Sequence, residues 1–527
     1  MGEINRRDLM ISLGSAGAAA LLSSCAIPMP EQRPYAGKLV DIHAHLFNAT
    51  DLPAAGFIKT VFLSHYPEQG FVQAMDLRAS GVVDALVDLF VHIVTGASPT
   101  AREEIRVLRG VAEARAEHAS SEGAERLVSR RVASYLVEPR LQSGVGSAVV
   151  RGAIIAAGTD GSTRLDSGLT EISAQEIALK AYRSDFDIGV YLKWFGLFTR
   201  YRYSLADELA RDHARLGYKA TLVAPAMVDF AKWFDIRSDV LSPLEEQVEV
   251  MGLVARRPGG PRLRGYVSFD PLREALHRAG RPGSSPLKLV EHAIRDHGFA
   301  GIKLYPPMGF KPWKNGNQPY PKQVTDFFGG RLETGRALDA ALADVYDLAV
   351  SLDAPIIAHA ADSNAAGLYY GRRGDPAHWI PVWENWPRLR VCLAHFGGFE
   401  TISEGAPAGS QLPESSWEYV IGAYVARHPE AGIFADLSSY TEVLKAGPAQ
   451  RAEIARAFRG YVARFDPEVR HLMFGSDWIM LGNQREHLFY AERLVAFLQK
   501  DCGLSDEQLE RILVHNAATF LDGASNW

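Results

Sequence analysis

Residues 38–45 read KLVDIHAH, a short apolar run that ends in two histidines separated by one residue. Successive side chains of a β-strand point to opposite faces, so His43 and His45 are expected on the same face. Two imidazoles on one face can bind a single cation from the same side. The stretch therefore predicts a β-strand whose carboxyl end carries a metal-binding pair.

Seven further apolar runs are predicted strands: ATLVAPA from residue 220, LRGYVSF from 263, AGIKLY from 300, APIIAH from 354, RVCLAH from 390, AGIFADL from 431 and HLMFGSD from 471. Helical patterns lie between them, at 287–294, 336–352, 417–425 and 487–498 among others, and Ser505 with Gln508 forms a capping box before the last helix. Alternating strands and helices predict an α/β fold with a parallel sheet. Eight such units predict a (β/α)8 TIM-like barrel.

The segment between the first two strands is several times longer than a βα unit needs. Helical patterns at 82–94, 102–116, 174–182 and 205–216, with the aromatic run YLKWFGLFTRYRY from residue 191, predict a large, mostly helical insertion after the first strand. Because it leaves the carboxyl end of that strand, we expect it to cap the substrate pocket. The alternative is a peripheral or oligomerising subdomain. Arg200 and Arg202 lie in this aromatic run. They either bind a substrate carboxylate at the mouth of the pocket or lie in the seam between cap and barrel.

The amino terminus carries Arg6 and Arg7, a Gly/Ala-rich apolar run and the sequence LSSC at residues 22–25. This pattern resembles a bacterial twin-arginine export signal with a lipobox, which implies cleavage before Cys25 and a lipid anchor. The alternative is an uncleaved anchor helix. The expected organisation is an export signal at 1–25, a tether at 26–37, the barrel at 38–50 and 217–527, and the cap at 51–216. We expect an exported periplasmic or cell-envelope lipoprotein.

Composition excludes several partner classes. The chain of 527 residues has a formal net charge of −6, so no global positive field favours nucleic acid or an anionic membrane. The three cysteines, Cys25, Cys392 and Cys502, form no CxxC pair, which excludes a thiolate zinc finger. The expected partners are a small-molecule substrate, a membrane only through the lipid anchor, and a second copy of the chain if it forms a homo-oligomer.

Polar residues end the later predicted strands. His359, His395, Asp436 and Asp477 follow one another at intervals of 36, 41 and 41 residues, about one βα unit each. Since the carboxyl ends of barrel strands meet at one rim, these side chains are expected to converge with the histidine pair. Lys303 ends the fourth predicted strand.

The motifs DIHAH, GIKLYPP, IIAHA, LAHFGG, ADLSS, FGSDW and HNAATFL, spread over roughly residues 38–522, resemble the amidohydrolase superfamily. The resemblance is to its amidohydrolase-related group, which includes aminocarboxymuconate semialdehyde decarboxylase and resorcylate decarboxylases. It implies a divalent metal bound by His43, His45, His359 and Asp477. It also implies that His395 polarises the substrate or the metal-bound water.

Three histidines and a carboxylate suit one Zn²⁺ with an open coordination position. Asp477 would accept a proton from water and deliver it to the leaving group, while His395 would stabilise an oxyanion. Lys303 has three readings: a carbamylated bridge to a second ion, an ammonium that binds a substrate carboxylate, or a partner of Asp477. The predicted substrate-binding residues are Asn48, Tyr305, Asp362 and Trp478, each with packing as the alternative. Asp436 is either a recurrent family position or a hydrogen-bond anchor at a strand end.

We expect a metal-dependent hydrolase that uses metal-activated water on an amide, lactone or ester bond of a small molecule. The first alternative is a metal-dependent, non-oxidative decarboxylase of an aromatic or enol-type carboxylic acid. The second is a non-catalytic metal-binding envelope lipoprotein.

Overall fold

The computed structural model describes residues 37–53, 82–137, 150, 188–234, 241–362, 365–367, 369–403 and 412–523. The predicted export signal with Cys25 and the predicted helix at 174–182 lie outside these described residues. Eight strands occur within them, one at each predicted run: β1 (Lys38–Ala44), β2 (Lys219–Pro225), β3 (Tyr266–Ser268), β4 (Gly301–Leu304), β5 (Ile356–His359), β6 (Val391–Ala394), β7 (Ile433–Asp436) and β8 (Leu472–Met473). The expected α/β fold is confirmed.

The strands pair in chain order and in parallel. β1 pairs with β2, and β3 to β8 form a second sheet in the order β3-β4-β5-β6-β7-β8. Parallel bridges join Val223 to Leu263 and Ala226 to Tyr266 between the two sheets. A third bridge, Ala44 to Trp478, joins β1 to the segment after β8. Bridges at both edges connect the eight strands into one ring, as a (β/α)8 barrel requires.

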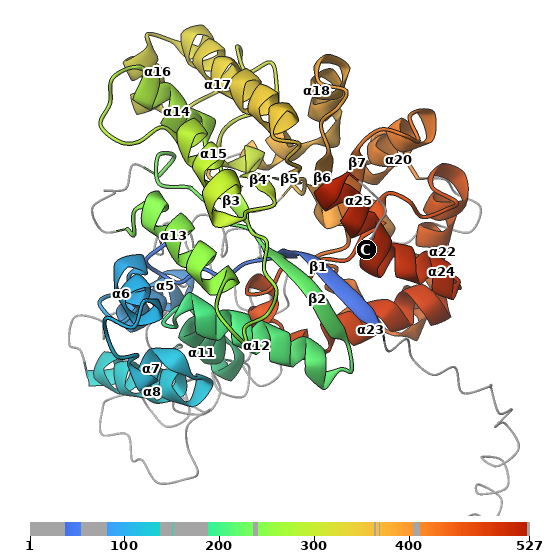
Figure 1. Cartoon of the computed structure of the whole chain (residues 1–527). Coiled ribbons are helices and arrows are strands. Elements are labelled where there is room, and N and C mark those ends of the chain that lie inside the picture. The colour runs from blue at the N-terminus through green and yellow to red at the C-terminus, as the bar shows by residue number, and fades with distance from the viewer. Residues whose placement is uncertain are drawn as a thin grey trace, which may run out of the picture. The chain divides into compact units, whose positions relative to one another are not determined.

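Helices connect the strands from β2 onward and surround the ring in Figure 1. They are α13 (Leu244–Ala255), α14 (Pro271–Arg278), α15 (Pro286–His297), α16 (Lys322–Phe328), α17 (Arg331–Ser351), α18 (Ile380–Asn385), α19 (Glu400–Ser403), α20 (Trp417–Arg427), α21 (Glu442–Lys445), α22 (Pro448–Phe465), α23 (Tyr490–Ala496), α24 (Asp506–Glu510) and α25 (Asn516–Asp522). The capping box predicted at Ser505 and Gln508 is present at the start of α24. The helix predicted at 487–498 is instead a 3₁₀ turn followed by α23 and a π-helical turn at Phe497–Asp501.

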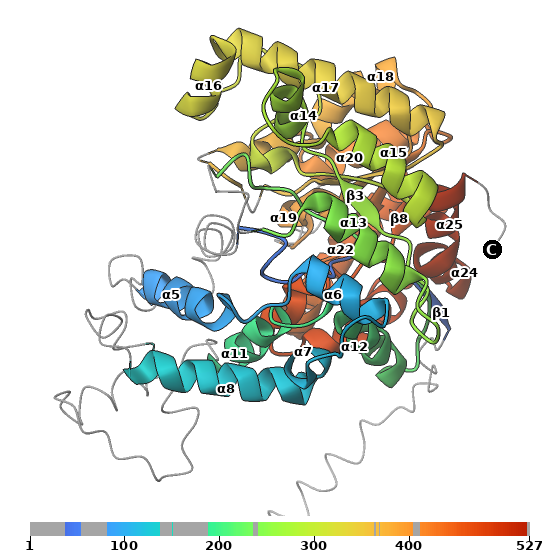
Figure 2. The same cartoon turned by 60° about the vertical axis from the view of Figure 1, so that its left-hand side comes forward.

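Between β1 and β2 the described residues form α5 (Val82–Val94), α6 (Ala101–Leu108), α7 (Ala116–Ala119), α8 (Ser121–Val137), α11 (Ile188–Leu197) and α12 (Arg202–Arg215). These helices lie together in both views (Figures 1 and 2). The single helix expected at 102–116 is wrong, because α6 ends at Leu108. Gly110 adopts a φ of 71°, a left-handed conformation that terminates helices. That these helices cap a substrate pocket remains a prediction.

The barrel strands bury both their apolar residues and the polar residues at their carboxyl ends. The apolar strand residues, such as Ile302, Ile357 and Leu393, are fully buried. The polar residues that end β1, β5 and β7 are also buried, and they include His43, His359 and Asp436. Buried polar groups require partners, so this rim is where hydrogen bonds or a ligand must satisfy them. None of the helices in the described part of the chain is both long and apolar enough to cross a bilayer.

Candidate metal centre

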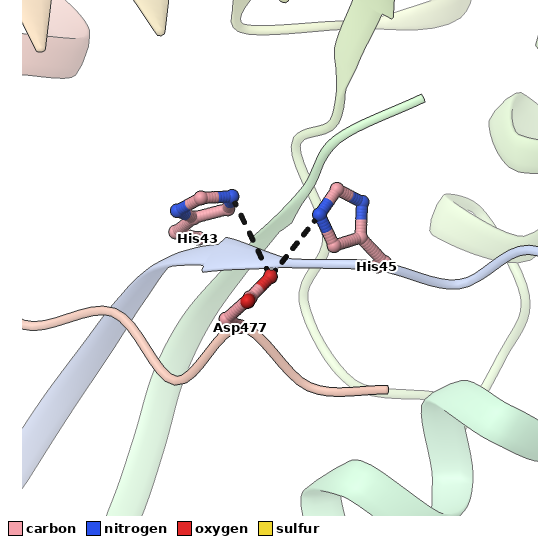
Figure 3. A group of neighbouring side chains, drawn as sticks. All are labelled: His43, His45 and Asp477. Atoms are coloured by element: carbon pink, nitrogen blue, oxygen red, sulfur yellow. Dashed lines mark ion pairs between the residues drawn. The ribbon is translucent and has the colours of Figure 1, made fainter. Parts of the chain in front are cut away.

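Three atoms that can each bind a metal ion converge at the carboxyl end of β1. Asp477 Oδ1, from the segment after β8, lies 3.2 Å from His45 Nε2 and 3.8 Å from His43 Nε2 (Figure 3). One donor atom from each of these residues lies within 4.8 Å of the other two, and all three residues are buried. The backbone fixes this approach, because the Asp477 N–H donates to the His43 carbonyl at 2.7 Å. The strand alternation that places both histidines on one face therefore brings them to the same carboxylate.

His45 supplies the clearest sign that a cation belongs here. Its Nδ1 lies 2.8 Å from the carbonyl oxygen of Ala226, which can only accept, so Nδ1 carries the proton. In the neutral ring the lone pair at Nε2 then faces the carboxylate oxygen of Asp477 at 3.2 Å. Two acceptors at that distance repel unless a proton or a metal cation lies between them. Neutral imidazole nitrogens and a carboxylate are a typical zinc donor set.

Asp436 and Ser438 fix the ring of His43. The Nδ1 of His43 lies 3.1 Å from Asp436 Oδ2 and 3.0 Å from Ser438 Oγ. The Ser438 hydroxyl donates its single proton to Asp436 Oδ1, so it accepts from the imidazole. Burial, followed by the nearby Lys303, lowers the pKa of His43 to about 4. His43 is therefore neutral near pH 7, with its proton at Nδ1 and its lone pair at Nε2.

The same hydroxyl fixes His395, whose Nδ1 lies 2.9 Å from Ser438 Oγ. The Nε2 of His395 is 3.2 Å from His359 Nδ1, so His359 donates this hydrogen bond and carries its own lone pair at Nε2. Burial is the main cause that lowers the pKa of both rings. Ser438 thus sets the tautomers of His43 and His395 directly and that of His359 through His395.

A second donor group overlaps the first and consists of His43, His395 and Asp436. Burial would raise the pKa of Asp436, but the His43 ring opposite it lowers that pKa well below its usual value. The carboxylate is therefore ionised, and it also accepts the backbone N–H of His395 at 3.0 Å. His359 lies in neither group, so its role as a fourth ligand remains a prediction.

Lys303 reaches the centre from β4. Its Nζ lies 3.3 Å from His43 Nε2, and its side chain is buried. Burial lowers the pKa of Lys303 to about 8, although the Asp436 and Asp477 carboxylates oppose this shift. The amine is therefore beside the donor atoms, and its carbamylation and its carboxylate-binding role both remain predictions.

The predicted substrate-binding residues lie in different surroundings. Tyr305 stacks on the His359 ring with a centroid distance of 4.3 Å, which places it beside the centre. The Asn48 amide donates to the carbonyls of Pro99 and Arg200, at 2.8 and 3.0 Å, contacts that favour a structural role. Trp478 Nε1 donates to Asp212 at 3.3 Å. Asp362 is half-exposed, with a distant ion pair to Arg372 at 3.9 Å.

The two arginines of the aromatic segment bind protein carboxylates. Arg202 is buried between Asp51 and Glu104, and Arg200 pairs with Glu208. Arg202 therefore joins the segment after β1 to α6, whereas the carboxylate partner of Arg200 lies on α12. Both guanidinium groups are paired with carboxylates of the protein itself.

Sequence reasoning missed two serines of the ADLSS motif. Ser438 bridges two histidines, and the Ser439 hydroxyl donates to Asp477 Oδ2 at 2.5 Å. It also missed Asp41, two residues before His43, which accepts the Ser476 hydroxyl at 2.6 Å. The signal available for all three was their position one or two residues from a predicted ligand or strand end. Small polar residues there orient the ligands of a metal site.

Comparison with known proteins places this arrangement in a class. The amidohydrolase family model matches residues 209–523, which is more than half of the chain. The chain therefore belongs to this amidohydrolase family. With the buried cluster of histidines and aspartate, this membership defines a metal-dependent enzyme, a hydrolase or a decarboxylase, that acts on a small molecule.

Solved structures give distant matches. A putative metal-dependent hydrolase from Lactobacillus casei is 15% identical and has a TM-score of 0.38, with 71% of this chain and 91% of that chain covered. A putative 2-pyrone-4,6-dicarboxylic acid hydrolase from Pseudomonas putida is 13% identical (TM-score 0.36; 60% and 86% covered). A 5-carboxyvanillate decarboxylase from Sphingomonas paucimobilis is 12% identical (TM-score 0.36; 60% and 82% covered). Comparison with curated proteins gives no match.

The hydroxyl of Ser438 provides a direct test of tautomer control. We expect Ser438→Ala to weaken metal affinity by about 10- to 100-fold, the usual effect of removing a group that orients metal ligands. Competition with a chelator of known affinity measures the change. Ser204→Ala, which removes a buried hydrogen-bonded serine from α12, is the control. Equal affinities of Ser438→Ala and the unmodified protein would refute tautomer control.

The role of His359 is tested in the same way. We expect His359→Ala to lose bound metal while the far-ultraviolet circular dichroism spectrum is retained, because the side chain is implied as a ligand. His428→Ala, at the exposed end of α20, is the matched control. Retention of one metal ion per chain in His359→Ala would remove this residue from the ligand set.

Proposed function

We propose that this protein is a metal-dependent hydrolase that adds water to an amide, lactone or ester carbonyl of a small molecule. The observation that carries the proposal is the convergence of one ligand atom from each of His43, His45 and Asp477 within 4.8 Å, with Asp477 Oδ1 at 3.8 and 3.2 Å from the two Nε2 atoms. Hydrogen bonds occupy the second nitrogen of each imidazole, so both histidines present a lone pair to one point. Such a donor set fits a catalytic Zn²⁺ site better than a closed structural one, because protein ligands do not fill every position.

A divalent cation held by these three residues, with His359 as the implied fourth ligand, would polarise a substrate carbonyl and lower the pKa of a water molecule. Asp477 would accept the proton of the attacking water and return it to the leaving group. The Ser439 hydroxyl on Oδ2 holds the carboxylate in one orientation. Oδ2 of Asp477 therefore accepts the serine hydroxyl, and Oδ1 faces the two histidines.

The arrangement limits what His395 can do. With Nδ1–H donated to Ser438 and Nε2 accepting from His359, the neutral ring has no N–H left for an oxyanion. The predicted oxyanion role therefore needs a second proton on this ring. Without it, His395 acts as a hydrogen-bond link between Ser438 and His359.

The test is a substrate panel of amides, lactones, esters and carboxylated aromatics, with turnover measured in ¹⁸O-labelled water. Hydrolysis incorporates one ¹⁸O atom into the product acid. Release of carbon dioxide without ¹⁸O incorporation would establish the decarboxylase alternative. Absence of turnover on the whole panel, with and without added zinc or manganese, would favour a non-catalytic metal-binding protein.

We also propose that the chain is an exported, lipid-anchored envelope protein, supported by Arg6, Arg7 and the LSSC sequence that ends at Cys25. Fractionation of cells and mass analysis of the mature amino terminus test this. A mature protein that begins at a diacylated Cys25 is expected. An intact Met1 terminus in the soluble fraction would exclude it.

A further inference from the structure

Two histidines lie together at the carboxyl end of α15. His292 Nε2 and His297 Nε2 are 3.1 Å apart, in the last two turns of a helix that ends at His297. The chain then enters β4 at Gly301, so this end of α15 lies at the amino-terminal side of the barrel strands. The candidate metal centre is at the carboxyl rim, which is the opposite side of a (β/α)8 barrel. The histidine pair is therefore separate from that centre.

The relative position of the two rings is that of imidazoles that share a cation. A cation about 2.05 Å from each nitrogen, with the nitrogens 3.1 Å apart, gives a nitrogen–cation–nitrogen angle of about 98°, between the square-planar and tetrahedral values. The ring centroids would then lie about 4.8 Å apart. Nitrogens that point directly at each other across 3.1 Å, as in a linear hydrogen bond, would place the centroids about 5.4 Å apart. The observed centroid distance is 4.7 Å, which matches the shared cation.

A carboxylate sets the tautomer of His292. Asp296 Oδ2 lies 2.6 Å from His292 Nδ1, and an ionised carboxylate can only accept a hydrogen bond. The proton of the neutral His292 ring is therefore at Nδ1, and its lone pair at Nε2 is on the side of His297. A carboxylate on the second nitrogen of a metal-binding histidine is a common arrangement, because it orients the ring and raises its basicity.

The ring of His297 is held against α13. Its Nδ1 packs on Gly252, where a Cβ atom would come within 2.5 Å of that nitrogen. Nδ1 is buried and has no hydrogen-bond partner in the part of the chain that the structure describes. Moving the ring proton to Nδ1 therefore breaks no hydrogen bond at that atom, and Nε2 is the nitrogen that can bind a ligand.

The surroundings of the pair attract a cation. The carboxylates of Asp296 and Glu249 act on His297, and the guanidinium of Arg256 opposes them. The carboxyl end of α15 adds the equivalent of about half a negative charge from the helix dipole, which favours cations at this end of a helix.

We propose that His292 and His297 form a second metal site, which binds a divalent transition metal ion through their two Nε2 atoms. Imidazole nitrogens suit Cu²⁺, Ni²⁺ and Zn²⁺, and Cu²⁺ binds a given set of such ligands most tightly. Two protein donors leave the other coordination positions to water, so the ion exchanges more readily than one in a closed structural site. The site does not depend on the proposed hydrolase chemistry.

Titration of the purified full chain, prepared without a polyhistidine tag, with Cu²⁺ tests the second site. We expect the unmodified protein to bind one more Cu²⁺ ion per chain than His292→Ala or His297→Ala, and the electron paramagnetic resonance spectrum of this ion to show two nitrogen ligands. Asp296→Asn should weaken its binding by about 10-fold, because the orienting carboxylate is lost. His428→Ala, which removes a histidine from the end of α20, should bind Cu²⁺ as the unmodified protein does.

Equal Cu²⁺ content in the unmodified protein and both alanine variants would overturn the proposal, and the contact between the two rings would then be a bent hydrogen bond. Loss of the additional ion from His428→Ala as well would also refute it, because binding would not depend on this pair. The His292 side chain is 53% exposed, so its alanine variant should keep the circular dichroism spectrum of the unmodified protein. Zinc content is measured in parallel, and loss of zinc from the carboxyl-rim centre of His292→Ala would show that the two sites are not separate.

Discussion

Asp477→Asn should abolish measurable turnover, with kcat reduced by about 10³-fold or more. Loss of a general base alone commonly lowers a rate by about 10²- to 10⁴-fold, and here the same carboxylate is also a metal donor. The amide oxygen of asparagine carries no full negative charge. It therefore attracts a cation less strongly than the carboxylate and repels the lone pair of His45 Nε2 less. We therefore expect bound metal per chain to fall together with kcat.

Asparagine is the best substitution for this test because it tolerates the left-handed backbone conformation of residue 477. Asp477 has a φ of 58°, in the left-handed region that Asn and Asp tolerate better than other side chains with a Cβ. Alanine at this position would add backbone strain to the loss of the carboxylate. His395 and Ser439 have φ values of 67° and 56°, so three residues of the centre share this unusual conformation. Such clustering is typical of functional sites.

Metal analysis and steady-state kinetics on the same preparations measure the effect. Asp466→Asn is the matched control, because Asp466 is also buried and accepts two backbone N–H groups before β8, away from the histidines. Its metal content and kcat should remain unchanged. If Asp477→Asn retains both metal and turnover, Asp477 is neither base nor ligand, and the proposed chemistry is wrong.

The fold was accessible from sequence because its strands are fully buried. Runs such as APIIAH and RVCLAH have apolar residues on both faces, which is the pattern of strands enclosed by helices. Helix ends were less accessible: the 102–116 pattern remained periodic beyond Leu108, where Gly110 ends α6. A weak periodic signal does not show which glycine adopts a positive φ.

The candidate centre was accessible only in part. Spacing placed His43, His45 and Asp477 at strand ends, and topology brings strand ends together. Spacing cannot show which hydrogen bonds orient an imidazole. The contacts by which Ser438 and Asp436 orient the rings of His43 and His395 are visible only in the coordinates. The sequence left two interpretations of Arg200 and Arg202 open, because a cation among aromatic residues has the same sequence pattern in a pocket and in a seam. The coordinates show both paired with carboxylates of the protein.

Arg202→Ala should destabilise the protein by about 3–5 kcal/mol, the usual cost of removing one partner from a buried ion pair. Arg202 is 1% exposed, and its Nε donates to Asp51 at 2.9 Å while its Nη1 donates to Glu104 at the same distance. Burial alone would lower the pKa of this guanidinium, but the two carboxylates raise it above its usual value. Without the guanidinium, two buried carboxylates would lose their cation.

These three residues join three parts of the chain. Asp51 follows β1, Glu104 lies on α6 and Arg202 begins α12, so the network connects the first strand to the helices that precede β2. Urea unfolding monitored by circular dichroism measures the change in free energy. Arg102 lies on α6, like Glu104, and forms a partly exposed ion pair with Glu246 of α13, so Arg102→Ala should cost no more than about 1 kcal/mol. Equal stabilities of the two variants would mean that Arg202 does not anchor these helices. The connection between the segment after β1 and the helices would then depend on aromatic contacts, such as Phe47 against Phe198.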